Sequence, residues 1–174
     1  MNKIAVLFLL AIALQKPVTS SAQLPCSQPE FRQFDFWIGQ WEAFQKNGQK
    51  AGDSKIEIIL DSCIILENWT SSSVVKGLRY AGKSYNTWNT RTKKWQQYWV
   101  DNTGGITEYF DGHYEDNKMI MQTANIAQPE GGFKIMKMTF YKLSKDKVRQ
   151  HGELSTDEGK TWKTDFDLEY RRKL

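Results

Sequence analysis

The sequence predicts an all-β protein: a closed antiparallel up-and-down barrel of about 8–10 strands with a short N-terminal helix. Segments rich in β-branched and aromatic residues follow one another from Trp41 to Tyr170. Short turns with glycine, asparagine or aspartate separate most of these segments, as in sequential hairpins. A meander of this length removes its exposed edges by closing on itself. A β-sandwich is the less favoured alternative.

The N-terminal residues have the composition of a signal peptide. A lysine precedes an apolar run of eleven residues (Ile4–Leu14), and Ser20, Ser21 and Ala22 offer small side chains for cleavage. The run is shorter than the roughly 20 residues that a transmembrane helix needs. We therefore expect residues 1–22 to be a cleaved signal peptide and 23–174 to form a single domain. The protein would be secreted or periplasmic, without insertion into a membrane.

A short helix is predicted immediately after the cleavage site. The sequence SQPE (27–30) has the form of a capping box, and Gly39 ends the helical pattern. Between them, Phe31, Phe34 and Trp37 recur at helical spacing. We expect this aromatic face to cover an apolar part of the barrel.

The two cysteines, Cys26 and Cys63, both lie in the predicted mature protein. In an oxidising compartment this favours one disulfide between them. A catalytic cysteine is the alternative, but no histidine or basic cluster lies near either residue in sequence.

The last hairpin has the clearest pattern. From Trp162 to Tyr170 apolar and polar residues alternate, which is typical of a half-buried strand. The preceding sequence STDEGKTW (155–162) fits S-x-D-x-G-x-T-W, the Asp-box that sialidases and related β-propellers repeat from blade to blade. Here the motif occurs once. Asp157, Gly159 and Trp162 are therefore expected to shape a hairpin turn and not to act on a sugar.

The sequence FDFWIGQWEAF (34–44) resembles the start of the calycin superfamily, which includes lipocalins, fatty-acid-binding proteins and nitrobindin-like barrels. In these families a short helix plugs one end of the barrel, and in lipocalins the tryptophan of G-x-W packs against an arginine from the last strand. The resemblance implies structural roles for Gly39 and Trp41. The arginine would be one of residues 171–172, with Arg149 as the other candidate.

The protein is also similar to a group of exported bacterial proteins for which no reaction is established. These share an F-D-F-W-x-G-x-W opening, a central strand with the pattern C-x-x-x-E-x-W and a late S-x-D-x-G-x-T-W. The corresponding residues here are 34–41, 63–69 and 155–162. This resemblance spans most of residues 23–174 and implies a barrel, but no activity.

A barrel of this size can enclose a cavity lined by alternate residues of each strand. We expect it to bind a small apolar or amphipathic molecule, whose polar group is held by charged residues and whose body is held by aromatic ones. The candidate ligand-binding residues are Glu67, Trp69, Trp95, Trp99, Arg149 and His151. The alternatives are that Arg149 and His151 face water and that the tryptophans fill the core.

Other classes of function have less support in the sequence. Without Lys3 and Lys16 of the predicted signal peptide the net charge falls from +4 to +2, which is small and evenly spread and argues against a nucleic-acid partner. No nucleophile or metal-binding motif is present, so neither a catalytic residue nor a metal is predicted.

If the cavity is an active site, Glu67, Glu108 and His151 are its acid–base candidates. A haem bound through His151 is the remaining cofactor hypothesis. A solid-core surface interaction module is the third reading.

Overall fold

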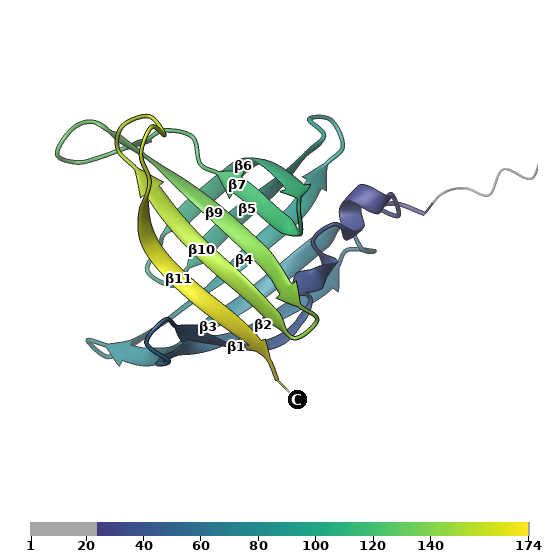
Figure 1. Cartoon of the computed structure of the whole chain (residues 1–174), viewed down its shortest axis with the longest axis horizontal. Helices are drawn as coiled ribbons and strands as arrows, with labels where there is room; N and C mark the ends of the chain where they lie inside the picture. The colour runs from purple at the N-terminus through teal and green to yellow at the C-terminus, as the bar shows by residue number, and fades with distance from the viewer. Residues whose placement is uncertain (1–23, 174) are drawn as a thin grey trace, which may run out of the picture.

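In a computed structural model, described here for residues 24–173, ten strands close into an antiparallel barrel (Figure 1). Neighbouring strands follow their order in the sequence, and β10 closes the ring by pairing with both β9 and β11. The two-residue β8 extends one end of β9 outside this ring. The predicted fold class is therefore confirmed. The strands are β1 (Gly39–Gln45), β2 (Lys50–Ile59), β3 (Ile64–Val75), β4 (Leu78–Asn89), β5 (Lys94–Asp101), β6 (Ile106–Glu115), β7 (Lys118–Gln122), β8 (Ile126–Ala127), β9 (Phe133–Ser144), β10 (Lys147–Ser155) and β11 (Lys163–Arg172).

The predicted signal peptide, residues 1–22, lies outside the described residues. Within residues 24–173, no helix has the length and apolar character needed to cross a membrane.

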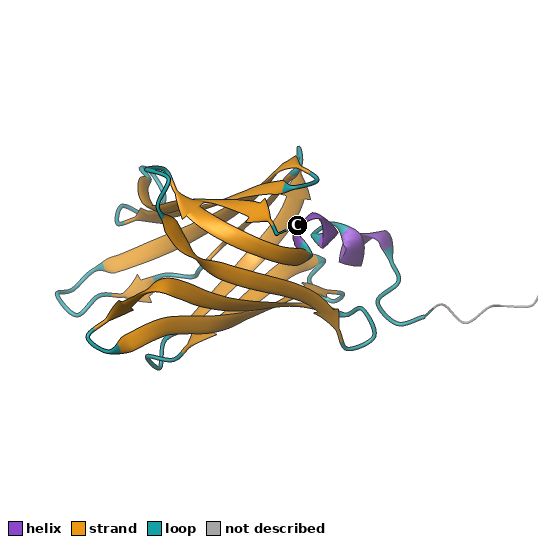
Figure 2. Cartoon of the chain, turned by 90° about the horizontal axis from the view of Figure 1, so that it is seen from below, coloured by secondary structure: helices purple, strands orange, loops and turns teal. Residues whose placement is uncertain are grey.

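Figure 2 shows a short helical segment at one end of the barrel. It consists of two 3-10 turns, η1 (Pro29–Arg32) and η2 (Asp35–Trp37), and its aromatic face is buried as predicted. The capping-box prediction is wrong. Ser27 donates its hydroxyl to the Leu24 carbonyl, 2.8 Å away, because it belongs to the preceding turn, in which Cys26 has a positive φ. Gln28 is the N-cap residue of η1 instead.

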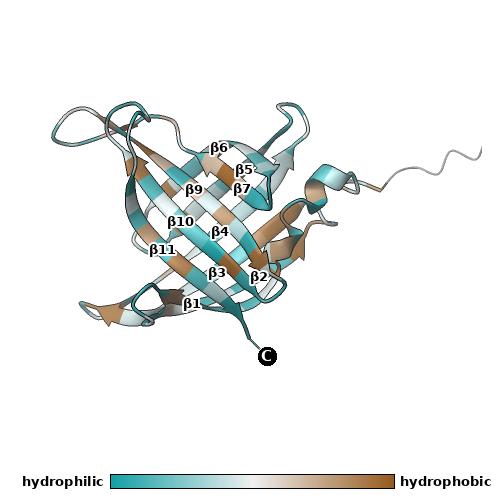
Figure 3. Ribbon diagram, in the orientation of Figure 1, coloured by the Kyte–Doolittle hydropathy of each residue, from teal (hydrophilic) through white to brown (hydrophobic). Residues whose placement is uncertain are grey.

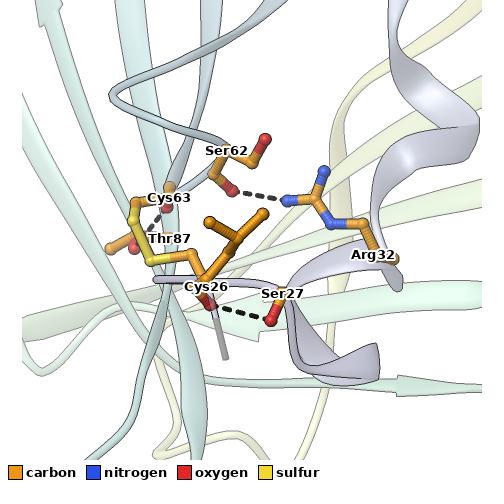
Figure 4. Close-up of a disulfide and its surroundings, with 7 residues drawn as sticks. Cys26, Ser27, Arg32, Ser62, Cys63 and Thr87 are labelled. Atoms are coloured by element: carbon orange, nitrogen blue, oxygen red, sulfur yellow. Dashed lines mark hydrogen bonds between the residues drawn. A yellow bond between two sulfur atoms is a disulfide. The ribbon is translucent and has the colours of Figure 1, made fainter. Parts of the chain in front are cut away.

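The disulfide Cys26–Cys63 is present and ties this helical segment to the turn between β2 and β3 (Figure 4). Two hydrogen bonds support the same junction. Arg32 Nη2 donates to the Ser62 carbonyl at 2.5 Å, and Thr87 Oγ1 donates to the Cys63 carbonyl at 2.9 Å. The cross-link therefore holds the segment against the end of the barrel that it covers.

Gly39 and Trp41 begin β1 beside the helical segment. The Trp41 indole donates to the Trp37 carbonyl (2.8 Å), and the Arg172 guanidinium lies 4.2 Å from the centre of the Trp41 ring. Arg172 also donates to the Ile38 carbonyl at 3.1 Å. Gly39 has a φ of 142°, and a Cβ atom there would overlap the Arg172 side chain. Of the three arginines considered from the sequence, Arg172 is thus the one that packs on Trp41.

The inner faces of the strands at the helical end form an apolar cluster, which we call the closed-end core. Trp37 stacks on Phe34 (5.1 Å between ring centres) and contacts Phe140 (4.6 Å). Figure 3 shows hydrophobic and hydrophilic residues alternating along the strands, as the inward and outward faces require. The buried members of the core include Phe34, Trp37, Trp41, Trp95, Met119, Met121, Phe140 and Val148.

The STDEGKTW turn joins β10 to β11 at the opposite end. Asp157 accepts hydrogen bonds from the Ser155 hydroxyl (2.7 Å) and from the Thr161 amide (2.8 Å), and Gly159 has a φ of 83°. Contrary to the alternation expected from the sequence, Trp162 precedes β11 and packs over the turn. Its indole donates to the Gly159 carbonyl at 3.0 Å.

Candidate functional site

The barrel encloses a cavity of about 500 Å³ beyond the closed-end core. It extends toward the end opposite the helical segment, where its rim includes the solvent-exposed Ser73 and Asp165. Inner-face residues of the strands line it because alternate side chains point into a barrel. The lining has a polar floor, an aromatic wall and an acidic rim.

Glu67 on β3 is the centre of the polar floor, and it is only 2% exposed. Ser54 on β2 donates its hydroxyl to Glu67 Oε1 at 2.9 Å, and Ser84 on β4 donates to Oε2 at 3.0 Å. The Tyr170 hydroxyl lies 3.4 Å from Oε1, from β11 across the barrel. Both carboxylate oxygens are thus held by hydroxyl groups of other strands.

Hydrogen bonds extend this floor on both sides. Asn86 Nδ2 donates to Ser84 Oγ and to the Ile65 carbonyl, each at 3.0 Å. Because a backbone carbonyl accepts only, it fixes the orientation of the Asn86 amide, and Gln97 Nε2 must donate to Asn86 Oδ1 (2.7 Å). On the other side, Tyr170 donates to Gln150 Oε1 at 2.6 Å.

Burial raises the pKa of Glu67 to about 7, although the hydrogen bonds from Ser54 and Ser84 act in the opposite direction. Burial also raises the pKa of the Tyr170 hydroxyl well above its ordinary value. Among residues 24–173, no lysine, arginine or histidine lines the cavity. The charge of the floor therefore changes near neutral pH, through Glu67.

Trp69 and Trp99 form the centre of the aromatic wall. Each indole lies across an inner-face glycine of the neighbouring strand, Trp69 over Gly52 and Trp99 over Gly82. A Cβ atom at either glycine would overlap the indole, so these glycines leave the space that the rings occupy. The remaining wall residues are Tyr80, Tyr109, Met136, Met138, Phe166 and Leu168.

The rim carries two further carboxylates. Hydrogen bonds from the Thr103 hydroxyl and from the backbone amides of Thr103 and Gly105 hold the pKa of Asp101 down at about 2. Its Oδ2 also accepts from the Trp99 indole (3.2 Å) and the Tyr80 hydroxyl (3.1 Å). Asp165 lies on the rim where the β10–β11 register shifts next to Gly152, and a bulge of this kind redirects a side chain.

Three of the six candidate ligand-binding residues, Glu67, Trp69 and Trp99, line this cavity together. Trp95 does not. It shares the inner face of β5 with Trp99 but lies in the closed-end core, 1% exposed, where its indole donates to Gln33 Oε1 at 3.1 Å. For Trp95 the structure therefore has the alternative considered from the sequence, in which a tryptophan fills the core.

Arg149 and His151 lie on the outer face of β10, because Gln150 between them points inward. Arg149 donates two hydrogen bonds to the Asp167 carboxylate, at 2.8 and 2.7 Å. His151 Nε2 lies 3.0 Å from Thr164 Oγ1. Both side chains therefore point away from the cavity, and neither can contribute to a site inside the barrel.

Glu108 is exposed on the outer face of β6, next to the inward-facing Tyr109. The proposed acid–base set of Glu67, Glu108 and His151 is therefore not assembled, since only Glu67 reaches the cavity.

A haem inside the barrel would need a ligand from an inner face, and His151 is on the outer one, so the residues do not fit that cofactor. Within residues 24–173, no cluster of three or more His, Cys, Asp or Glu side chains is arranged to hold a metal ion.

Sequence reasoning missed the groups that surround Glu67. Ser84 and Asn86 stand at alternate positions of β4, which is the pattern of a polar inner face, but the same strand carries polar residues on its other face as well. Gln150 and Tyr170 come from strands more than 80 residues further along the sequence. No local pattern brings them together with Glu67.

A scan against models of known protein families finds no match, and a search of curated proteins finds no relative.

Proposed function

We propose that the protein is an exported binding protein that holds a small, partly apolar molecule in the barrel cavity. The observation that carries the proposal is the cavity of about 500 Å³, with a hydrogen-bonded carboxyl group at its floor and two tryptophans on its wall. Ligand sites of proteins are concave and mostly apolar, with a few fixed polar groups that orient the ligand.

We also propose that the barrel is calycin-like. The helical segment covers one end of the barrel, as the plug helix of that superfamily does, and the G-x-W tryptophan packs on Arg172 of the last strand. Export is supported by the Cys26–Cys63 disulfide, because such bonds persist in oxidising compartments, and by the signal-peptide composition of residues 1–22. A secreted or periplasmic location follows from this proposal.

The alternatives have less support from the described residues. An enzyme using the same cavity would have Glu67 as its acid–base group, without the two partners expected from the sequence. A solid-core interaction module would leave no room for a ligand, whereas this interior has a cavity of the size that small molecules occupy.

The proposal is tested by titrating the purified protein with N-phenyl-1-naphthylamine, an uncharged apolar probe that becomes fluorescent out of water. Ser71 lines the cavity, so Ser71→Phe fills part of it. Ser72, its neighbour on β3, does not line the cavity, so Ser72→Phe adds the same ring outside. We expect saturable binding that Ser71→Phe weakens at least about tenfold and Ser72→Phe leaves unchanged. Equal binding by both variants, or none by the natural protein, would contradict the proposal.

A further inference from the structure

We propose that the barrel cavity selects organic cations, and in particular protonated primary amines attached to an aromatic or aliphatic body. This inference rests on the proposed binding function and names the ligand class. It starts from the charges of the cavity, which differ in sign from those of the whole protein. The protein has 24 lysines and arginines against 20 aspartates and glutamates. The cavity has three carboxylates and, among the described residues, no basic side chain.

These three carboxylates are also unpaired. Neither Glu67 nor Asp101 nor Asp165 forms an ion pair with any side chain among residues 24–173. Several carboxylates on the outer surface do form such pairs. Asp167, for example, lies 2.7 Å from both Arg149 and Lys46. A cation in the cavity would therefore meet negative charge that no described side chain neutralises, and at the buried Glu67 charge interactions are stronger than in water.

The second observation is an unpartnered acceptor at the floor. The network fixes Gln97 Nε2 against Asn86, and Gln97 Oε1 accepts no hydrogen bond within residues 24–173. Gln97 is 2% exposed and lines the cavity. In a side chain that lines the cavity, Gln97 Oε1 is thus an acceptor that no described donor occupies, and a ligand N–H group can bond to it.

The wall fits the same ligand. Trp69 and Trp99 line the cavity between the floor and the rim, and tryptophan is the best aromatic partner for a cation. The apolar part of the ligand would contact these rings together with Met136 and Met138. A carboxylate ligand of the same body is disfavoured, because it would bring a fourth negative charge beside Glu67, Asp101 and Asp165 with no cation to offset it.

The test compares three probes that share one body and differ in charge: 4-phenylbutylamine, 4-phenylbutan-1-ol and 4-phenylbutyrate. Each competes with N-phenyl-1-naphthylamine at about pH 8 and low salt, where Glu67 is mostly ionised. We expect the amine to bind about tenfold more tightly than the alcohol, and the carboxylate to bind more weakly than both.

Matched variants connect the preference to the cavity. Glu67→Gln should reduce the amine-to-alcohol ratio to near one, while Glu108→Gln, on the outer face of β6, should leave it unchanged. Asp165→Asn on the exposed rim is a second variant that removes charge without touching the buried floor, and we expect it to lower the ratio roughly two- to threefold, the effect of one charge in solvent-exposed surroundings.

Two outcomes distinguish an error in the ligand class from an error in the proposed binding function. If all three probes displace the dye with equal affinity, or the carboxylate binds best, the cation preference is wrong and the binding function stands. If neither the dye nor any probe binds, the proposed function itself is wrong.

Discussion

Replacing Glu67 with glutamine should change how the stability of the barrel depends on pH. The Glu67 carboxyl group is buried at the cavity floor, and burial raises its pKa from 4.5 to about 7. The folded protein therefore keeps a proton on Glu67 in a pH range where the unfolded protein releases it. This contribution to stability is complete below the unfolded pKa of 4.5 and is lost as the pH rises through about 7.

The magnitude follows from the two pKa values. Each unit of difference corresponds to about 1.4 kcal/mol, so a carboxyl group with these values costs about 3 kcal/mol of folding free energy at pH 8 relative to pH 4. Glutamine does not ionise and has a similar shape. It also changes the hydrogen bonds with Ser54 and Ser84, which shifts the stability of the variant equally at every pH, so the ionisation of Glu67 is measured by how the difference between the two proteins changes with pH.

The assay is urea unfolding of the natural protein and Glu67→Gln at several pH values between about 4 and 8. We expect the variant to gain about 3 kcal/mol relative to the natural protein over this range. Glu108→Gln, at an exposed position on the outer face, serves as the control and should give a curve parallel to that of the natural protein. A difference between the natural protein and Glu67→Gln that stays constant with pH would refute the reasoning.

Three other predictions concern the scaffold around the cavity. Arg172→Ala removes the guanidinium from the Trp41 ring and should lower the free energy of unfolding by about 1–2 kcal/mol, whereas Arg171→Ala, on the outer face, should lower it less; equal effects would contradict the role given to Arg172. Cys26→Ser should cost about 2–5 kcal/mol, measured by urea unfolding under non-reducing conditions, while far-ultraviolet circular dichroism still shows the barrel. Asp157→Ala should lower the melting temperature more than Glu158→Ala does, because Asp157 accepts the hydrogen bonds that close the β10–β11 turn. Similar melting temperatures for the two turn variants would show that the turn does not depend on this carboxylate.

The sequence was sufficient for the architecture because the relevant signals are local. Alternation along a strand, turn residues between strands and an aromatic segment before Gly39 each involve residues close together in the sequence. The disulfide could also be predicted, since Cys26 and Cys63 are the only cysteines in the sequence.

Which face of each middle strand points into the barrel was harder to predict from the sequence. β10 has polar residues on both faces, so alternation alone does not tell which face is inside. Gln150 points inward, where the Tyr170 hydroxyl is its partner, and Arg149 points outward, where Asp167 is its partner. Register shifts add a second difficulty, because Asp165 lines the cavity next to Phe166 although strict alternation would place them on opposite faces.

The central claim is that the barrel interior holds a ligand, and the seven tryptophans of the protein offer a direct test. Nuclear magnetic resonance resolves the indole N–H signals while N-phenyl-1-naphthylamine is added. We predict that the signals of Trp69 and Trp99, on the cavity wall, shift in a saturable way. Those of Trp41, in the closed-end core, and of Trp162, over the β10–β11 turn, should stay in place. Shifts confined to Trp162, or no shift at Trp69 and Trp99, would contradict a ligand site inside the barrel.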